Sequence, residues 1–323
     1  MIRTALRELF GIEHPIIQAG MGPFGSGADL AAAVSNAGAL GTIGAAARSA
    51  EDLQEQLARI KDLTDRPYIV NLVFTAVNDW NIPMILESAP PIISFALGDP
   101  EDLVDRAHES GIKFIQQIHT VKQADLVAER GVDVIIAQGT EAGGFTGLLS
   151  TMALVPQVVD AVSPIPVLAA GGIADGRGIA AAMILGAQGV NMGTRFLASA
   201  EANISDDWKQ AILAAQSEEA VKAEIWKDIF PPAREGAFDV VPRALRTPFI
   251  NEWQERREEA HQVAERLIGE VGAAMQQGRM FDKVPFTGQS AGMIQEILPA
   301  AEIVGRLIAE AERALKRAPT LVA

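Results

Sequence analysis

Eight short apolar segments in this chain are each followed by glycine or a polar turn, and helical patterns separate most of them. The candidate strands span residues 15–19, 40–43, 68–74, 92–96, 114–118, 132–138, 166–170 and 189–192. Their nearly continuous apolar character is typical of parallel strands covered on both faces. Eight strands alternating with helices predict a closed parallel α/β barrel. The alternative is an open doubly wound sheet, which would usually carry a GxGxxG fingerprint after its first strand, and the glycine-rich residues 20–25 do not match it.

The segments between the strands carry helix signals. Ser49 is a candidate N-cap, and Leu53, Leu57 and Ile60 fall on one face of the helix that follows it. Further helices are expected at residues 100–110, 121–130 and 178–185. This alternation is what a barrel with an outer ring of helices requires.

The strand pattern ends near residue 200, and the chain becomes rich in charged helical sequence. We expect the barrel in residues 1–202, a helical extension over its mouth in residues 203–285, and a C-terminal segment in residues 286–323. The last helix, at about 291–316, would return to the barrel. Four apolar residues of the extension are expected to be exposed, as a lid or a dimer contact: Trp226, Ile229, Phe230 and Phe249.

Charge and composition exclude several classes of function. The net charge is -14 and no Lys/Arg cluster stands out, so nucleic acid and anionic membranes are poor partners. The chain has no cysteine, which excludes disulfides and thiolate chemistry, and its four histidines lack metal-ligand spacing, so no metal is expected. A charged N-terminus and the absence of a run of about 18 apolar residues predict a cytoplasmic protein with a small-molecule substrate.

The last two candidate strands both run into glycine. Gly171 and Gly172 follow one of them, and Gly193 and Thr194 follow the other. Glycine lets main-chain N–H groups approach an anion closely, and the corresponding loops of such barrels commonly hold a phosphate. We therefore predict a phosphorylated ligand or cofactor at the barrel mouth, with Arg195 adding positive charge.

Polar residues end other strands at the same mouth. Asn71 and Gln138 carry amides, which both donate and accept hydrogen bonds, as a ring such as isoalloxazine requires; simple backbone capping is the alternative. Gly143 and Gly144 lie in a flexible loop that can approach a planar or phosphorylated ligand, or form an ordinary tight turn.

Few side chains offer acid/base chemistry. His119 follows the fifth strand and is either a general acid/base at the mouth or a helix-capping or surface histidine. Glu141 is either a base or an acceptor of backbone N–H bonds that fixes its loop. The chain has no Ser–His–Asp order and no paired-carboxylate spacing, so a bound cofactor is expected to carry the chemistry.

Together these segments resemble the nitronate monooxygenase family, which also includes flavin-dependent enoyl-acyl-carrier-protein reductases and NAD(P)H:quinone reductases. The resemblance covers nearly the whole chain, and the residues that carry it are 17–22, Asn71, 138–144, 169–176, 193–196 and 288–292. It implies a triosephosphate isomerase-type (TIM) barrel with FMN at its C-terminal mouth, and a homodimer.

The resemblance also implies roles for individual residues. The FMN phosphate would rest on amides of Gly171, Gly172, Gly193 and Thr194, and Asn71 and Gln138 would touch the isoalloxazine. The remaining residues of the implied flavin site are Gly20, Met21, Gly22, Gln117, Gly143, Gly144, Asn191, Met192 and Gln289. Gln117 would stand where some members have a lysine.

One position departs from the family pattern. Many members have histidine, their usual acid/base candidate, where this chain has Phe145. Phenylalanine cannot transfer a proton but offers an apolar wall beside the flavin. The resemblance therefore favours oxidation of nitronates, which are already anionic, with O2. The alternatives are an NAD(P)H-dependent reductase of an enoyl thioester or quinone, and a flavin-binding accessory protein that lost catalysis through Phe145.

Overall fold

The eight predicted strands form one parallel sheet that closes on itself. A computed structural model describes residues 2–230 and 235–321. Residue 1 of the predicted barrel, residues 231–234 of the extension and residues 322–323 of the C-terminal segment therefore lie outside the described residues. The strands are β1 (Ile16–Gln18), β2 (Gly41–Gly44), β3 (Tyr68–Val73), β4 (Ile92–Ala96), β5 (Lys113–Ile118), β6 (Val134–Gln138), β8 (Val167–Ala170) and β9 (Gly189–Met192). Their order is β1-β9-β8-β6-β5-β4-β3-β2, and a parallel bridge between Ile17 and Leu40 joins the two edges.

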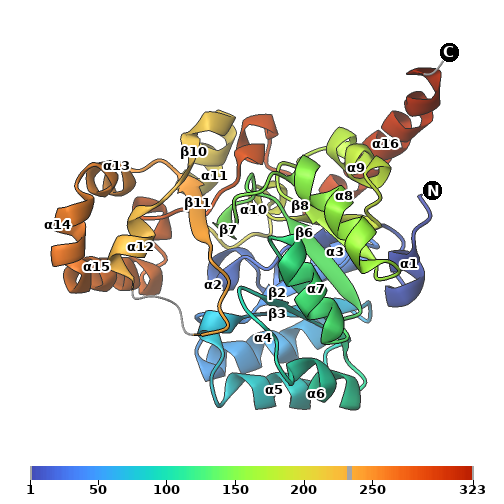
Figure 1. Ribbon diagram of the computed structural model, residues 1–323, viewed down its shortest axis with the longest axis horizontal. Helices are drawn as coiled ribbons and strands as arrows, with labels where there is room; N and C mark the ends of the chain where they lie inside the picture. The colour runs from blue at the N-terminus through green and yellow to red at the C-terminus, as the bar shows by residue number, and fades with distance from the viewer. Residues whose placement is uncertain (1, 231–234, 322–323) are drawn as a thin grey trace.

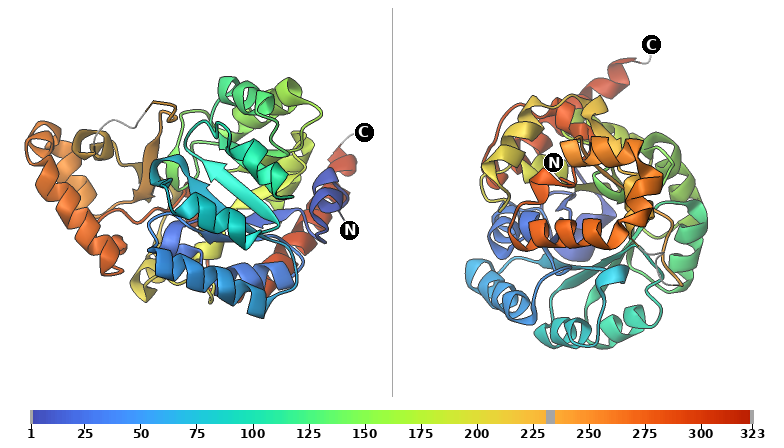
Figure 2. Two further views of the ribbon diagram at one scale, coloured as in Figure 1. Left: turned by 90° about the horizontal axis from the view of Figure 1, so that it is seen from below. Right: turned by 90° about the vertical axis from the view of Figure 1, so that its left-hand side faces the viewer.

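Helices surround this sheet in a ring, which is seen in Figure 2 (right), where the view is along the barrel axis. They are α3 (Ala28–Asn36), α4 (Ala50–Leu63), α5 (Asn81–Ser88), α6 (Leu103–Glu109), α7 (Val121–Glu129), α8 (Thr151–Val162) and α9 (Gly176–Ile184). Ser49 caps α4 as expected, accepting a hydrogen bond from the Asp52 amide at 3.2 Å. The prediction of a TIM barrel is confirmed.

The barrel interior is apolar below the mouth. Ile17, Ile69, Ile115 and Leu168 point inward from four strands and form one buried cluster. Helix α1 (Ala5–Phe10) adds Leu6 and Phe10 to the same cluster. A ligand site is therefore expected at the other end of the barrel, where the strands reach their carboxyl ends.

The extension stands over that end as a separate layer, seen on the left of Figure 1. Its helices are α11 (Asp206–Ala214), α12 (Ile225–Ile229), α13 (Pro248–Glu255), α14 (Arg257–Gln262) and α15 (Ala264–Gln276). It also contains two strands that the sequence pattern did not predict, β10 (Ala220–Lys222) and β11 (Val241–Leu245). They form an antiparallel sheet with β7 (Gly144–Thr146), which lies in the loop after β6.

Two residues expected to be exposed are instead buried. Ile229 and Phe249 belong to the core of the extension, together with Ile212 and Leu267, because the short helices pack their apolar faces on each other. Trp226 and Phe230 are partly buried against this cluster. This cluster also includes Ala174, Leu197 and Ala198, so the hydrophobic core of the extension is continuous with the mouth of the barrel.

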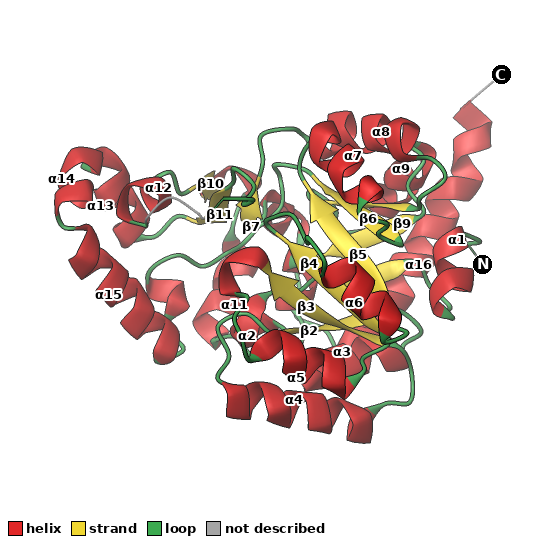
Figure 3. Cartoon of the chain, turned by 60° about the horizontal axis from the view of Figure 1, so that its bottom comes forward, coloured by secondary structure: helices red, strands yellow, loops and turns green. Residues whose placement is uncertain are grey.

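The chain ends in a long helix, α16 (Ala300–Arg317), which runs along the barrel beside α9 and α3 (Figure 3). It begins later than predicted, after Pro299, and contacts α9 closely: the Glu310 carboxylate accepts a hydrogen bond from the Gly176 amide at 3.0 Å. The short α-helices are α2 (Gly22–Gly25) and α10 (Thr194–Leu197), and 3-10 turns occur at Phe74–Ala76, Ser217–Glu219, Met280–Asp282, Gln289–Met293 and Ala318–Leu321. None of the helices in the described part of the chain has the length and hydrophobicity needed to cross a bilayer.

Candidate functional site

A cavity of about 370 Å³ lies at the carboxyl ends of the barrel strands and is covered in part by the extension. It brings together most of the residues predicted to bind a ligand. Those that line it are Gly20, Met21, Gly22, Asn71, Gln117, Gln138, Gly143, Gly144, Phe145, Gly171, Gly172, Asn191, Met192, Gly193 and Thr194. Two predicted site residues, His119 and Gln289, are not part of the lining, although Ser290 is.

One edge of the cavity offers unpaired main-chain amides. Gly171 and Gly172 have φ values of 100° and 72°, a conformation that glycine adopts without strain. Within the described residues, no acceptor takes a hydrogen bond from the amides of these two glycines, of Gly193 or of Thr194. Four free N–H groups at the ends of adjacent strands form a site suited to an anion.

Side-chain amides form a second polar edge. Gln138 is 8% exposed, and its Oε1 is buried with no hydrogen-bond donor in the described part of the chain. Asn71 donates from Nδ2 to Ser94 Oγ at 2.9 Å and packs directly on Gly20, where an added Cβ would lie 2.3 Å from Oδ1. A buried acceptor without a donor is unfavourable, so the Gln138 carbonyl fits a ligand that presents an N–H group.

The loop between β6 and α8 is fixed by its own polar contacts. The Glu141 carboxylate accepts hydrogen bonds from the amide and the hydroxyl of Thr151, each at 3.0 Å. This arrangement corresponds to the loop-fixing role of Glu141, not to that of a base. Gly143 lies against Gly288, whose nitrogen would be 2.6 Å from an added Cβ, so only glycine fits there.

An aromatic wall, made of Phe145, Trp226 and Phe286, closes the side of the cavity next to the extension, and Phe230, outside the lining, packs on Trp226. The Phe145 ring lies 5.4 Å from Trp226 and 5.6 Å from Phe286, and Trp226 stacks on Phe230 at 4.1 Å. Phe145 holds this place because β7 pairs with β11, with Phe145 opposite Pro242.

Sequence reasoning did not assign Trp226 or Phe286 to the cavity, nor Met275 and Met280, which also line it. The only signal was the occurrence of apolar residues such as Trp226 within a charged helical stretch.

The described residues that line the cavity include no Asp, Glu, His, Lys, Arg or Tyr. The positive charge expected from Arg195 is absent from the lining as well: its guanidinium is buried and donates to the carbonyls of Ala198 at 2.8 Å and Glu296 at 2.6 Å. The local polarity therefore comes from amides and hydroxyls, which can orient a ligand but cannot exchange protons with it near neutral pH.

His119 is 0% exposed and lies behind the loop that carries Gly147. Neither ring nitrogen has a hydrogen-bond partner among the residues that the structure describes, and the ring meets Phe238 edge to face at 6.3 Å. Burial lowers the pKa of His119 to about 4; the nearby carbonyl of Gln138 opposes this shift, and the positive charge of Lys222 adds to it. The structure thus holds His119 as a neutral buried ring away from the cavity.

The match to known proteins agrees with this geometry. The model of the nitronate monooxygenase family matches residues 3–310. The chain belongs to this family. A probable nitronate monooxygenase of Staphylococcus saprophyticus is 36% identical over an alignment of 272 residues, and the match covers 69% of this chain and 76% of that protein. FabK from Thermotoga maritima superposes with a TM-score of 0.89 at 35% identity, over 100% of both chains.

A third relative bears the name of a dehydrogenase. The (3aS,4S,5R,7aS)-5-hydroxy-7a-methyl-1-oxo-octahydro-1H-indene-4-carboxyl-CoA dehydrogenase of Rhodococcus jostii is 42% identical over 214 residues, or 66% of this chain. The match spans 60% of that relative's length. The relatives from Staphylococcus saprophyticus and Rhodococcus jostii are named as a monooxygenase and a dehydrogenase. This chain therefore has oxidoreductases as homologues.

Proposed function

We propose that this member of the nitronate monooxygenase family is an FMN-dependent oxidoreductase that oxidises alkyl nitronates with O2. The observation that carries the proposal is a single cavity that combines free main-chain amides, an unpartnered Gln138 carbonyl and a lining without titratable side chains in its described part. Such a site is suited to binding a cofactor and offers no acid or base of its own.

The residues present fit FMN. The free amides of Gly171, Gly172, Gly193 and Thr194 would hold its phosphate, which needs several donors and no side-chain charge. The amides of Asn71, Gln117 and Gln138 would face the N–H and C=O edge of the isoalloxazine, and the Gln138 acceptor would gain the donor that it lacks. When bound, FMN would supply electron transfer between the substrate and O2.

The absence of a proton-exchanging group from the described lining favours a substrate that is already ionised. A nitronate is the conjugate base of a nitroalkane, so no C–H bond has to be deprotonated by the protein. Phe145 and the aromatic wall would exclude water and pack against the alkyl part of the substrate.

The test begins with the purified protein. We expect a visible flavin spectrum, release of FMN on denaturation, and O2 consumption with propyl-2-nitronate that exceeds the rate with neutral 2-nitropropane. A colourless protein that does not take up added FMN would overturn the proposal. Bound FMN that is reduced neither by a nitronate nor by NADH or NADPH would instead point to an accessory flavoprotein.

A second activity has support from the aromatic wall and from the dehydrogenase relative. Trp226, Phe286, Met275 and Met280 give the cavity an apolar side that suits a bulky acyl group. The alternative function is therefore NAD(P)H-dependent redox chemistry on an acyl thioester or a quinone. Rapid mixing with NADH or NADPH without oxygen separates the two: fast bleaching of the flavin favours this alternative, whereas no bleaching together with nitronate turnover favours the first.

A further inference from the structure

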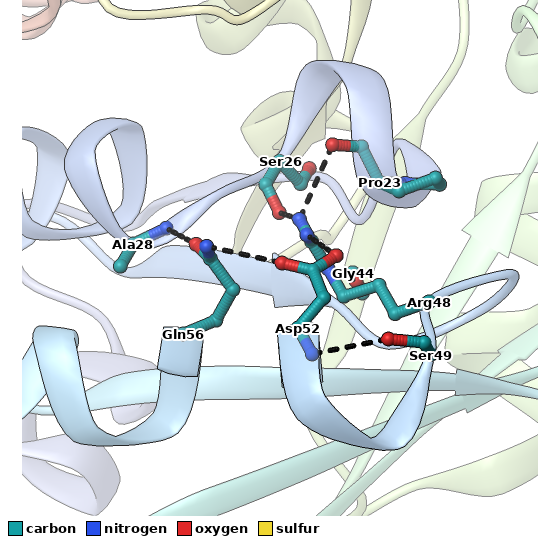
Figure 4. Close-up of polar contacts among 8 residues, drawn as sticks. All are labelled: Pro23, Ser26, Ala28, Gly44, Arg48, Ser49, Asp52 and Gln56. Atoms are coloured by element: carbon teal, nitrogen blue, oxygen red, sulfur yellow. Dashed lines mark hydrogen bonds and ion pairs between the residues drawn. The ribbon is translucent and has the colours of Figure 1, made fainter. Parts of the chain in front are cut away.

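Arg48 is a buried arginine whose guanidinium joins two loops at the edge of the cavity (Figure 4). Its Nε donates to the Gly44 carbonyl at 2.7 Å, and one Nη donates to the carbonyls of Pro23 at 3.2 Å and Ser26 at 3.1 Å. The other Nη pairs with Asp52 at 2.7 Å. The first loop follows β1 and the second follows β2, so one cation bridges two neighbouring βα loops.

Both loops line the cavity. The first contributes Met21, Gly22 and Pro23, and the second contributes Ala46 and Ala47. They meet backbone to backbone, since a Cβ on Gly44 would lie 2.7 Å from the Gly22 oxygen. The position of one loop therefore determines that of the other.

The residue before Arg48 is held in an unfavourable conformation. Ala47 has φ 61°, in the left-handed region that alanine rarely adopts. Such a conformation persists only where its surroundings hold it. Arg48 donates to the Gly44 carbonyl at the end of β2 and to the Ser26 carbonyl in the loop after β1. These two hydrogen bonds restrain the backbone at Ala47.

A second layer of contacts fixes the guanidinium itself. Asp52 lies in the first turn of α4, where its amide is capped by Ser49, and it also accepts a hydrogen bond from Gln56 at 3.3 Å. Gln56 in turn accepts one from the Ala28 amide at the start of α3, at 2.8 Å. Lysine could not replace this arrangement, because its single ammonium cannot reach acceptors on both loops with the planar geometry of arginine.

We propose that Arg48 is a positioning residue that holds the two loops after β1 and β2 in the arrangement that receives the ring of the flavin. This inference rests on the proposed function for the identity of the ligand. The contacts predict that loss of Arg48 frees both loops while the rest of the barrel stays folded.

The test compares Arg48→Met and Arg48→Lys with a matched control, Arg59→Met. Arg59 lies on the same helix α4 and makes a bidentate pair with Asp29 of α3, at 3.1 and 2.6 Å, outside the cavity lining. Two quantities are measured on apoprotein: the Kd for FMN and the hydrogen exchange rates of the Met21 and Gly44 amides, which donate to Ser26.

We expect Arg48→Met to raise the FMN Kd about tenfold and to speed exchange at both amides, with Arg48→Lys intermediate and Arg59→Met unchanged. If both Arg48 variants matched Arg59→Met in affinity and exchange, the proposal would be overturned. If Arg48→Met did not fold, Arg48→Lys would carry the same comparison. If the wild-type protein bound no FMN, the proposed function would fail, and the exchange rates alone would decide whether Arg48 orders the loops.

Discussion

The ring of Phe145, on the barrel loop, meets the ring of Trp226, on the extension, at an interplanar angle of 81° with 5.4 Å between centroids. This contact joins the two layers of the protein at the wall of the cavity. It also puts an apolar ring at the position where the family resemblance leads to the expectation of histidine. The cavity therefore has a polar edge at Gly171 and Gly193 and an aromatic wall that cannot exchange protons.

The first prediction concerns the missing acid/base group. Phe145→His would place an imidazole in a cavity whose described lining has no titratable group. We expect turnover of neutral nitroalkanes to rise about 100-fold, because general base catalysis typically contributes that much, with a pH dependence centred near the imidazole pKa. Steady-state rates with 2-nitropropane and its nitronate across this pH range are the measurement. Phe145→Asn, which is polar but does not titrate, is the control, and equal rates in both variants would contradict the prediction.

The second prediction concerns folding stability at acidic pH. The pKa of His119 is lowered by burial from 6.5 to about 4, so between these values the unfolded chain binds a proton that the folded chain does not. The resulting stabilisation is complete above pH 6.5 and is lost as the pH falls toward 4. It amounts to about 3 kcal/mol of unfolding free energy.

Urea unfolding of the wild type and of His119→Phe over this pH range isolates the effect, since the carboxylates are common to both proteins. We expect the wild type to lose about 3 kcal/mol more than the variant on acidification. Parallel stability curves would show that folding does not lower the pKa of His119.

Local signals were enough to predict the barrel and one edge of its site. Each strand is an apolar run, and β1, β2, β6, β8 and β9 end at or just before a glycine or an amide side chain. Gly171 and Gly193 mark two of these strand ends without help from distant residues. His119 was harder to place. Side-chain alternation along a strand would set it beside Gln117 at the mouth, but β5 ends at Ile118, and the chain turns there into the cap of α7.

Contacts between distant segments were not predictable. Strand β11 reads as a loop because it contains Pro242 and Arg243, yet it is buried. Arg243 is tolerated because it donates to the carbonyls of Thr140 and Ala220. Neither acceptor is near Arg243 in the sequence, and the same pairing places Phe145 in the cavity wall.

The third prediction separates ligand binding from stability at Gln138. Gln138→Met removes a buried carbonyl oxygen that has no donor in the described part of the protein. We expect the apoprotein to be as stable as the wild type or slightly more stable, and the FMN Kd to rise about tenfold, because the amide is satisfied only by the ligand. Thermal unfolding of apoprotein and fluorescence titration with FMN are the measurements.

Gln123→Met is the matched control for that experiment. Gln123 accepts a hydrogen bond from the His119 amide at 2.8 Å and is not part of the cavity lining. Its loss should lower stability by about 1 kcal/mol and leave FMN affinity unchanged. If Gln138→Met lowered the stability of the apoprotein without weakening FMN binding, the Gln138 amide would serve folding and not ligand binding.

The fourth prediction tests the anion edge with two glycines. A Cβ added to Gly193 would lie 3.6 Å from the Met21 sulfur and 3.7 Å from the Ala19 Cβ, two residues of the cavity lining. These are ordinary contact distances, so the apoprotein has room for alanine at this position. The methyl group would nevertheless stand beside the free amides where we propose that the phosphate binds. We expect Gly193→Ala to leave the unfolding free energy of the apoprotein within about 0.5 kcal/mol of wild type and to weaken FMN binding about tenfold.

Gly171→Ala should behave differently, because φ 100° is strained for alanine and the Cβ would lie 3.0 Å from the Gly139 oxygen. It should lower the unfolding free energy of the apoprotein by about 1–2 kcal/mol in addition to weakening FMN binding. Gly305→Ala on α16, with nothing within 4 Å of the added Cβ, is the control that should keep wild-type affinity. If Gly193→Ala bound FMN as tightly as Gly305→Ala, the amides after β8 and β9 would not be the phosphate site, because a methyl group there could not avoid the bound anion.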